Sequence, residues 1–139
     1  GTVKDDARVA GAVITLGANG RIADDLLVTG GAIETKFGSQ VGGDLSIEQG
    51  YAAARLATLS ALAAVKALAG GLDHVVQVVK VLGLVNVAPG FNQTPDVIHG
   101  CSDLLLAVFG EAGRHARSAV GVTLPYNFAV EIELIVEVR

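Results

Sequence analysis

The chain has 139 residues, a length that fits one domain with a single hydrophobic core, and we expect that domain to span residues 1–139. Its formal net charge is −4 and its 10 Lys and Arg residues are scattered, which argues against nonspecific binding to nucleic acid through clustered positive charge. The longest apolar stretch, residues 56–71, is too short and too rich in alanine to span a membrane, so we expect neither a nucleic-acid nor a membrane partner.

Hydrophobic residues make up 51% of the chain and charged residues only 17%, a high apolar share for a small domain that must cover its own surface. We therefore expect part of the surface to be buried against another subunit. The single cysteine, Cys101, excludes an internal disulfide, and no targeting segment is recognisable, so we expect a cytoplasmic protein.

The first forty residues predict short antiparallel strands. Residues 9–16 and 26–29 are rich in side chains that favour strands, and Asn19-Gly20 between them is a strong turn signal.

A long helix is predicted over residues 47–69, which are rich in Ala and Leu and contain no proline. Ser46, followed three residues later by Gln49, predicts a capping box at its start, and Gly70-Gly71 predicts its end. A set of side chains recurs at helical spacing and predicts the face laid on the sheet: Ile47, Tyr51, Ala54, Leu59, Leu62, Val65 and Leu68.

Residues 75–87 are apolar on both faces, which is typical of a central strand covered on both sides. After a loop at 88–95, residues 96–109 show helical spacing, and Gly110 ends this second helix. With two further strands at the C-terminus, the order is β-β-α-β-α-β-β, an α/β (α+β) fold with a single mixed sheet and both helices on one face. The other face of such a sheet stays uncovered unless a second subunit buries it, which again predicts an oligomer.

The last strand, residues 128–139, alternates apolar and polar side chains with a period of two, and its polar face carries three glutamates, among them Glu131 and Glu133. Residues 116–124 hold Arg117, and the Pro-Tyr-Asn that follows them is typical of a turn. We expect the two segments to form a hairpin that brings Arg117 towards Glu131 or Glu133.

Nothing in the sequence indicates a cofactor or a metal. Glycine-rich nucleotide-binding motifs are absent, and the three histidines, His74, His99 and His115, lack metal-ligand spacing. Cys101 on the apolar side of a helix is typical of a core residue. Ser118 lacks the Gly-x-Ser-x-Gly setting of a hydrolase nucleophile.

Two interpretations of Arg117 and the acidic strand face remain open. In the first, Arg117 holds a substrate carboxylate through a two-pronged hydrogen bond, and Glu131 positions or deprotonates a water. In the second, the two residues form a buried or interfacial ion pair that fixes the oligomer. The pattern alone favours neither interpretation.

Several segments together carry a family resemblance. Residues 113–122 (GRHARSAVGV), the Leu-Pro that follows and the Glu-Ile-Glu that begins at Glu131 form a C-terminal signature, and residues 26–30 (LLVTG), 41–50 (VGGDLSIEQG) and 72–76 (LDHVV) fit the same pattern. Over nearly the whole chain the sequence resembles the YjgF, or Rid (reactive intermediate deaminase), family. It resembles in particular the branch described as YjgF and chorismate-mutase-like, which shares Ser-Asp-Leu-Leu and Phe-Gly-Glu-Ala-Gly-Arg-His-Ala-Arg-Ser.

The resemblance implies a chorismate-mutase-like fold and a homotrimer with three clefts between subunits. It also implies hydrolysis of enamines or imines, such as 2-aminoacrylate, to a keto acid and ammonia, without a cofactor. The essential Arg of the family falls on Arg117, and the Glu that helps to place the attacking water falls on Glu131. The substrate-binding residues that the resemblance implies are Thr29, Gly30, Gly31, Arg117 and Ser118.

The sequence departs from the family pattern at three polar positions. No N-terminal Pro-Tyr-Ser motif is found in residues 1–20, Ala119 stands where the family has a Cys, and Ser102 stands where it has a helix Asn. Three functions are therefore weighed. The first is an enamine or imine deaminase, and the second is a non-catalytic trimeric module that binds small carboxylate metabolites. The third is an endoribonuclease, which the acidic charge and the lack of a basic or aromatic patch disfavour.

Overall fold

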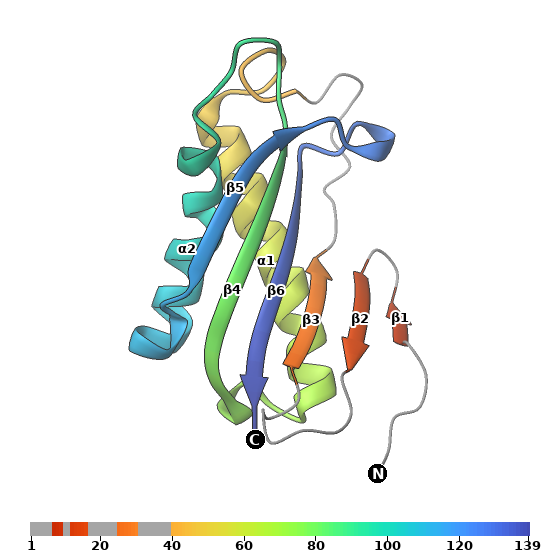
Figure 1. The fold of residues 1–139 in the computed structure, drawn as a ribbon, viewed down its shortest axis with the longest axis vertical. Helices are drawn as coiled ribbons and strands as arrows, with labels where there is room; N and C mark the ends of the chain where they lie inside the picture. The colour runs from red at the N-terminus through yellow and green to blue at the C-terminus, as the bar shows by residue number, and fades with distance from the viewer. Residues whose placement is uncertain (1–6, 10–11, 17–24, 31–39) are drawn as a thin grey trace.

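The computed structural model describes residues 7–9, 12–16, 25–30 and 40–139. Within them, six strands form one mixed sheet in the order β1-β2-β3-β6-β4-β5, accompanied by two α-helices (Figure 1). In chain order the elements are β1 (Ala7–Val9), β2 (Ala12–Leu16), β3 (Asp25–Gly30), α1 (Ile47–Ala69), β4 (Val75–Asn86), α2 (Thr94–Phe109), β5 (Ala116–Val122) and β6 (Val130–Val138). Short 3₁₀ turns lie at Leu72–His74, Gly110–Gly113 and Pro125–Asn127.

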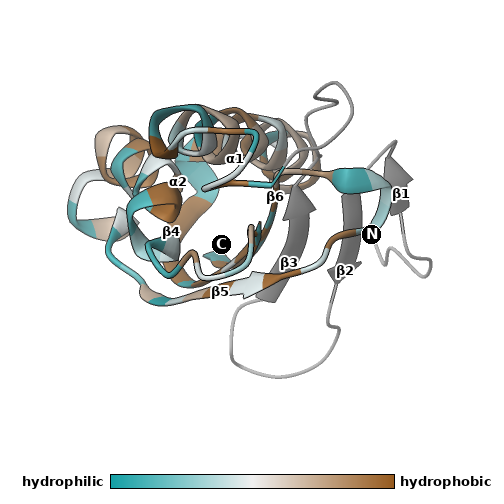
Figure 2. Cartoon of the chain, turned by 90° about the horizontal axis from the view of Figure 1, so that it is seen from above, coloured by the Kyte–Doolittle hydropathy of each residue, from teal (hydrophilic) through white to brown (hydrophobic). Residues whose placement is uncertain are grey.

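Both α-helices lie side by side on the same side of the sheet, as the view from above shows (Figure 2). Helix α1 packs on β3 and β6, whereas α2 packs on β4 and β5. The predicted fold class, one mixed sheet with two helices on one face, is confirmed. The segment predicted as one strand at residues 9–16 is divided into β1 and β2, which pair antiparallel. Strands β2 and β3 also pair antiparallel, and the predicted Asn19-Gly20 turn lies outside the described residues.

Helix α1 has the ends that the sequence predicts. The backbone N–H of Gln49 donates to Ser46 Oγ at 3.2 Å, and the N–H of Ser46 donates to Gln49 Oε1 at 2.9 Å, which completes the capping box. At the other end Gly70 adopts the left-handed conformation, with φ of 80°, which a residue without a Cβ adopts at little cost. Helix α2 begins at Thr94, two residues before the predicted start, and Gly110 ends it as predicted.

The buried face of α1 is made of small side chains. By length and composition, α1 is the one helix of the described residues that could cross a membrane, yet here it packs against α2 and the sheet. Its buried residues are Gly50, Ala53, Ala54, Ala57, Thr58, Ala61, Leu62 and Val65. Leu59, predicted on this face, is 45% exposed instead, as is Leu56 at 48%. The prediction for Leu59 was wrong because it followed the large side chains, whereas the close approach of α2 requires small ones.

The two helices touch at Gly100 of α2. A methyl group placed on Gly100 would overlap the carbonyl oxygen of Tyr51, so the backbones can approach only because this position has no side chain. Beside this contact the Tyr51 hydroxyl donates to Asp103 Oδ2 at 2.9 Å and ties the helices together. The position of α2 over β4 and β5 therefore depends on this contact with α1.

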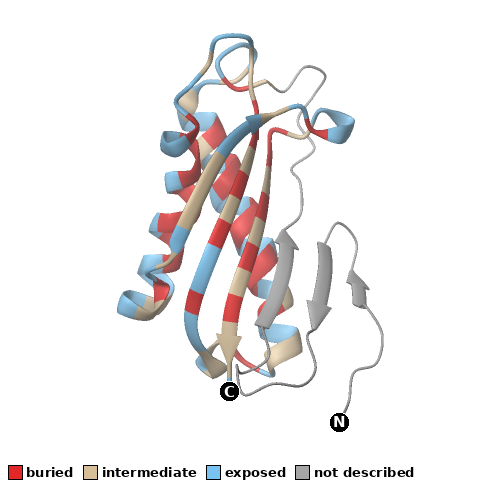
Figure 3. Cartoon of the chain, viewed as in Figure 1, coloured by how far each residue is buried: buried red, intermediate tan, exposed pale blue. Residues whose placement is uncertain are grey.

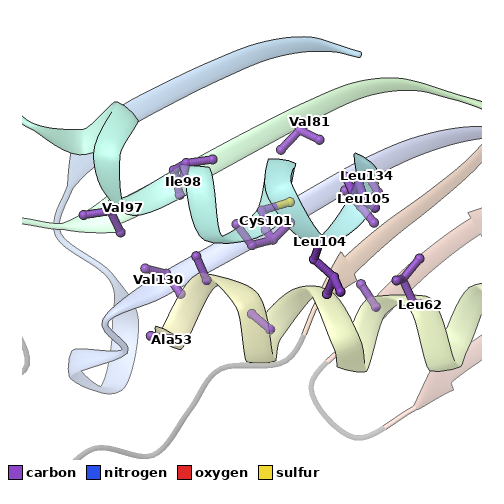
Figure 4. Packing of buried hydrophobic residues seen from close by; sticks show 14 of the residues in the cluster. Ala53, Leu62, Val81, Val97, Ile98, Cys101, Leu104, Leu105, Val130 and Leu134 are labelled. Atoms are coloured by element: carbon purple, nitrogen blue, oxygen red, sulfur yellow. The ribbon is translucent and has the colours of Figure 1, made fainter. Parts of the chain in front are cut away.

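The main hydrophobic core fills the layer between the helices and the sheet. Figure 4 shows side chains of α1, α2 and the strands meeting there, with the Cys101 sulfur among them. The largest fully buried side chains include Ile98 and Leu105 of α2 and Ile132 and Leu134 of β6. These contacts bury the apolar face of β6 as the period of two predicts.

The predicted hairpin between the last two strands is wrong. Strand β5 pairs parallel with β4, Arg117 lying opposite Val81, and β6 pairs antiparallel with the other edge of β4. The turn at Pro125–Asn127 exists, but it carries the chain over β4 rather than between neighbours. A short connection favours a hairpin locally; here the apolar strand β4 gains a partner on both edges instead.

Alternation along the central strands separates two faces with different environments (Figure 3). In β6, Ile132, Leu134 and Val136 are fully buried under the helices, whereas Glu131 and Glu133 point to the face that no helix covers. That uncovered face of the described chain is partly apolar, because Leu82 and Leu84 of β4 and Val120 of β5 stand in the same rows as the glutamates.

Substituting Gly100 with Ala should destabilise the protein. The added methyl group meets backbone of α1, which cannot move aside as a flexible side chain would, so the helices must separate. We expect the free energy of unfolding to fall by about 1–3 kcal/mol, although Ala favours a helix over Gly by up to about 1 kcal/mol. Denaturant unfolding measures the change.

The matched control is Ala107→Ser, at an exposed position of the same helix. It should change the free energy of unfolding by less than about 0.5 kcal/mol. A Gly100→Ala protein as stable as the parent would contradict the close contact of α1 with α2.

Candidate functional site

Arg117 points to the helix side of the sheet, at its edge. Its neighbour in β4 is Val81, which is fully buried under the helices, so the two side chains share that face. The guanidinium is partly buried and reaches α2. Its Nη1 donates to Ser102 Oγ at 3.2 Å, and its Nη2 lies 3.4 Å from His99 Nε2. Arg117 is therefore held against α2 by two contacts.

His115 completes this cluster and has a defined proton arrangement. Its Nδ1 lies 2.6 Å from the carbonyl oxygen of Gly113, and its Nε2 lies 3.0 Å from Ser102 Oγ. A carbonyl oxygen can only accept, so Nδ1 carries a hydrogen and donates it, and in the neutral form of the imidazole this is the single ring hydrogen. Nε2 is then the acceptor for the Ser102 hydroxyl. One consistent set of hydrogen bonds joins Arg117, Ser102, His115 and Gly113.

A pocket of about 320 Å³ opens over this cluster. It is lined by Ser102, Leu106, Arg114, His115 and Arg117. Two guanidinium groups thus face one small cavity. Arg114 is ion-paired through Nε with Glu111 Oε2 at 2.7 Å, and both side chains are exposed. Among the residues that the structure describes, no carboxylate forms a salt bridge with Arg117, so its positive charge is available to an anion.

The local sequence explains why these groups meet. His99 and Ser102 are three residues apart on α2 and therefore share a helix face, the one that looks toward β5. After α2, the 3₁₀ turn at Gly110–Gly113 reverses the chain. Gly113 lies so close to the end of α2 that a Cβ there would overlap the carbonyl oxygen of Leu105. This close return places His115 and Arg117 beside Ser102.

The other predicted site residues lie elsewhere in the chain. Ser118 follows Arg117 and stands opposite Leu82 of β4, so it points to the uncovered face of the sheet. Glu131 lies on that same face, where burial raises the pKa of its carboxyl group and the Glu133 carboxylate raises it further. Within one chain, then, Arg117 and Glu131 lie on opposite faces.

The predicted backbone contacts lie partly within the described residues. Thr29 and Gly30 are in β3, where they pair with Glu133 and Ile132 of β6. Gly31 lies outside the described residues. The roles predicted for these three residues, and for Arg117, Ser118 and Glu131, stay predictions.

Sequence reasoning missed three groups of the cluster: His99, Ser102 and His115. It treated the histidines only as metal ligands and Ser102 only as a departure from a family pattern. The usable signal was the i, i+3 spacing of His99 and Ser102 on a predicted helix, followed after a glycine turn by His and Arg two residues apart at the start of a strand.

The fold and the family are shown by comparison with known proteins. One mixed sheet with two helices on one face is the architecture of chorismate-mutase-like proteins. Residues 12–138 match the family described as YjgF/chorismate mutase-like, putative endoribonuclease, and the chain therefore belongs to the YjgF family. The resemblance of the sequence to that family is confirmed.

Three individual proteins are similar to this chain. Protein TCP17 of Trypanosoma cruzi is 46% identical over 102 residues, which are 72% of this chain and 64% of that protein, so the chain spans less than two thirds of that relative. The structure of Atu1372 from Agrobacterium tumefaciens, a protein of unknown function, is 36% identical with a TM-score of 0.76, over 89% of this chain and 80% of that one. A protein of Shewanella oneidensis MR-1 described as a putative endoribonuclease is 32% identical with a TM-score of 0.80, over 99% and 92%.

One thiol lies near the site, that of Cys101, which the structure places in the core as the sequence predicts. The residue is fully buried, and that burial raises the pKa of the thiol to about 11. A thiol that is neutral and shielded at neutral pH is a poor nucleophile. Cys101 thus packs next to the cluster without the reactivity that catalysis would need.

Cys101 should therefore resist thiol reagents in the native protein. At pH 8, a pKa of about 11 leaves roughly one thiolate in a thousand, and burial blocks the reagent as well. We expect an aromatic disulfide reagent to react at least about 100-fold faster after unfolding in guanidinium than before it. Rapid stoichiometric labelling of the folded protein would contradict the buried position of this residue.

Proposed function

We propose that this protein hydrolyses small 2-imino or 2-amino-unsaturated acids to keto acids and ammonia, in clefts between the subunits of a homotrimer. The observation that carries the proposal is Arg117, a guanidinium that lines a pocket and forms no salt bridge with a carboxylate among the described residues. A substrate carboxylate is the natural partner for that planar fork of donors.

The chemistry needs orientation more than a cofactor. The carbon of an imine is already electrophilic, so water can add to it once both are held in place. Addition gives a carbinolamine, which loses ammonia and leaves the keto acid. Hydrogen bonds from Arg117 to the substrate carboxylate, worth about 1.5–3 kcal/mol when charged and shielded, would fix the carbon that reacts. Glu131 would place the attacking water.

The two residues can serve one substrate only if different subunits supply them. Arg117 lies on the helix side at the edge of the sheet, and Glu131 lies on the uncovered face of the same chain. That face also carries Val120, which is 43% exposed, in the same row as Leu84 and Glu131. Apolar surface of this kind favours a subunit contact. We propose that the uncovered face of one subunit meets the β5 edge of the next.

A second candidate is a trimeric module that binds a carboxylate metabolite and turns nothing over. It is favoured by the departures from the family pattern, since Ala119 stands where the family has a Cys and Ser102 stands where it has an Asn. In that case Arg117 keeps its role and the hydrolytic step is lost. The endoribonuclease activity in the description of the family is the third and least favoured candidate, because a net charge of −4 opposes contact with RNA phosphates.

Ammonia release measures the proposed activity directly. We would add the protein to 2-aminoacrylate and 2-iminobutyrate generated in place by a dehydratase. The protein should accelerate release, and Arg117→Ala should lower kcat/KM about 10- to 150-fold, the loss expected for a charged hydrogen bond of about 1.5–3 kcal/mol. Arg55→Ala, an exposed arginine of α1, is the matched control and should behave like the parent.

The result separates the candidates. Acceleration that survives in Arg117→Ala would rule out the proposed role of this arginine. No acceleration by a folded protein, together with binding of keto acids that calorimetry detects and Arg117→Ala abolishes, would favour the non-catalytic module. RNA cleavage that survives in Arg117→Ala would have to arise outside this pocket.

Mixing two variants of low activity tests whether a cleft is shared. Arg117→Ala and Glu131→Gln subunits should each form homotrimers of low activity, but co-refolding them in equal amounts should raise the activity. If Arg and Glu come from different subunits and the subunits associate at random, about one quarter of all clefts pair an intact Arg117 with an intact Glu131. Recovery close to that fraction is expected. A mixture no more active than its parents would mean that both residues of a cleft come from one chain.

A further inference from the structure

The cluster beside Arg117 contains a pair that proposed substrate binding does not use. Ser102 Oγ has one partner that donates to it and one that accepts from it: Arg117 Nη1 at 3.2 Å and His115 Nε2 at 3.0 Å. The Gly113 carbonyl fixes the imidazole in the form whose Nε2 is free to accept a proton. Ser102 is 8% exposed, and both it and His115 line the pocket.

We infer that Ser102 and His115 form the proton relay of this pocket, an inference that rests on the proposed hydrolysis of imines. As the water oxygen bonds to the imine carbon, the water gives a proton to Ser102 Oγ, and the hydroxyl proton of Ser102 passes to His115 Nε2. The electron pair of the C=N bond moves to nitrogen. The proton on His115 then returns through Ser102 to that nitrogen, which gives the carbinolamine. In a second transfer the same pair moves the proton of the new carbinolamine hydroxyl to the nitrogen as the C–N bond breaks, so that ammonia leaves and the C=O bond of the keto acid forms. No net proton, oxidant or reductant is required.

Each neighbour of the pair has a function in this step. The Gly113 carbonyl orients the imidazole and accepts from its Nδ1, as the third member of a catalytic triad does. Arg117 donates to the oxygen that carries partial negative charge during the transfer. A guanidinium has five N–H donors, so these contacts leave donors of Arg117 free for the substrate carboxylate. Substrate binding and proton transfer thus meet at one arginine.

The other ionisable groups near the pocket fit the step less well. His99 contacts Arg117 from the exposed side, and its other nitrogen lies 3.7 Å from Asp96 Oδ1, so it is placed to hold the guanidinium. Arg114 is paired with Glu111. The Cys101 thiol is buried in the core. Among the described residues, His115 is the base that lines the pocket and whose Nε2 is hydrogen-bonded to a hydroxyl group, that of Ser102.

The relay gives Glu131 a separate task. A carboxylate that a neighbouring subunit brings to the pocket orients the water, whereas Ser102 and His115 exchange the proton with it from within the chain that holds Arg117. The alternative is a purely structural role, in which the hydrogen bond between Ser102 and His115 only holds β5 against α2. A structural tie would change stability and leave chemistry alone, so the two roles predict different kinetics.

The experiment measures kcat and KM for ammonia release from 2-iminobutyrate. Ser102→Ala and His115→Gln should each lower kcat about 100-fold or more, the usual contribution of acid–base catalysis, with KM within about twofold of the parent. Arg117→Ala should instead raise KM as well. Matched controls are Ser60→Ala on the exposed side of α1 and His74→Gln outside the pocket, which should keep the parental kcat.

Two rescue experiments measure recovery of kcat, which a purely structural role of the pair would not produce. Ser102→Thr keeps the hydroxyl and should recover most of the kcat that Ser102→Ala loses. Added imidazole should restore activity to His115→Ala in a saturable manner, because it can occupy the space the side chain leaves. Circular dichroism and the size of the oligomer confirm that each variant folds, and Ser102→Ala, which removes one oxygen, tests the relay if His115→Gln does not fold.

The outcomes separate this inference from the function on which it rests. If the parent is active and Arg117→Ala is not, but Ser102→Ala and His115→Gln keep full kcat, the relay is overturned and the deaminase stands. A loss confined to KM or to stability also overturns the relay, as does a lack of rescue both in Ser102→Thr and by imidazole in His115→Ala. A parent protein that does not accelerate ammonia release at all overturns both.

Discussion

Strand β5 pairs parallel with β4 from Ala116 to Val122, and this pairing decides which polar groups can act together. A parallel neighbour cannot be reached through a tight turn, so the chain passes along α2 first and enters β5 from the far end. The strand that carries Arg117 thereby becomes the edge of the sheet next to α2. The arginine meets Ser102 and His99, while β6, which follows β5 in sequence, lies on the other side of β4 with its glutamates facing away.

Arg117 can reach Ser102 and His99 only because α2 packs close to the β5 edge of the sheet. Gly100 lets the backbone of α2 approach that of α1, and Gly113 lets the chain after α2 stay close to the end of the helix, so these two close approaches involve backbone rather than flexible side chains. A helix held by backbone contacts keeps the distance between Ser102 and β5 narrow. Hydrogen bonds of 3.0–3.2 Å from Ser102 to His115 and Arg117 are the consequence.

Much of this fold could be predicted from the sequence, because its signals are local. The capping box at Ser46 and the glycine at 70 define α1, and the period of two in β6 identifies its buried face. The partner of a strand is not a local property. Alternation along β6 shows which face Glu131 points to, but not whether β4 or β5 is the neighbour of β6 in the sheet. The prediction of a hairpin between β5 and β6 therefore failed. The prediction that Leu59 faces the sheet failed for a similar reason, since α2 determines how closely the two helices approach and therefore which side chains of α1 are buried.

The candidate site could be predicted only in part, because it too depends on contacts between distant segments. Arg117 stands out through its motif, whereas helical spacing places Ser102 on a face with His99 but does not show that it lies 3.0 Å from His115, a residue 13 positions further along the chain.

The distribution of charge over the two faces bears on how copies of the chain would meet. On the helix side, Arg117 and Arg114 line the pocket. On the uncovered face, Glu131 and Glu133 are neighbours two residues apart, and burial, with the Glu133 carboxylate as a second cause, raises the pKa of Glu131. A two-fold contact between two uncovered faces would bring these carboxylates onto their own copies. A ring in which each uncovered face meets the next β5 edge brings carboxylate towards arginine instead. Charge therefore favours the cyclic arrangement, the one in which each proposed cleft would receive Glu131 from one chain and Arg117, with the proposed Ser102–His115 relay, from another.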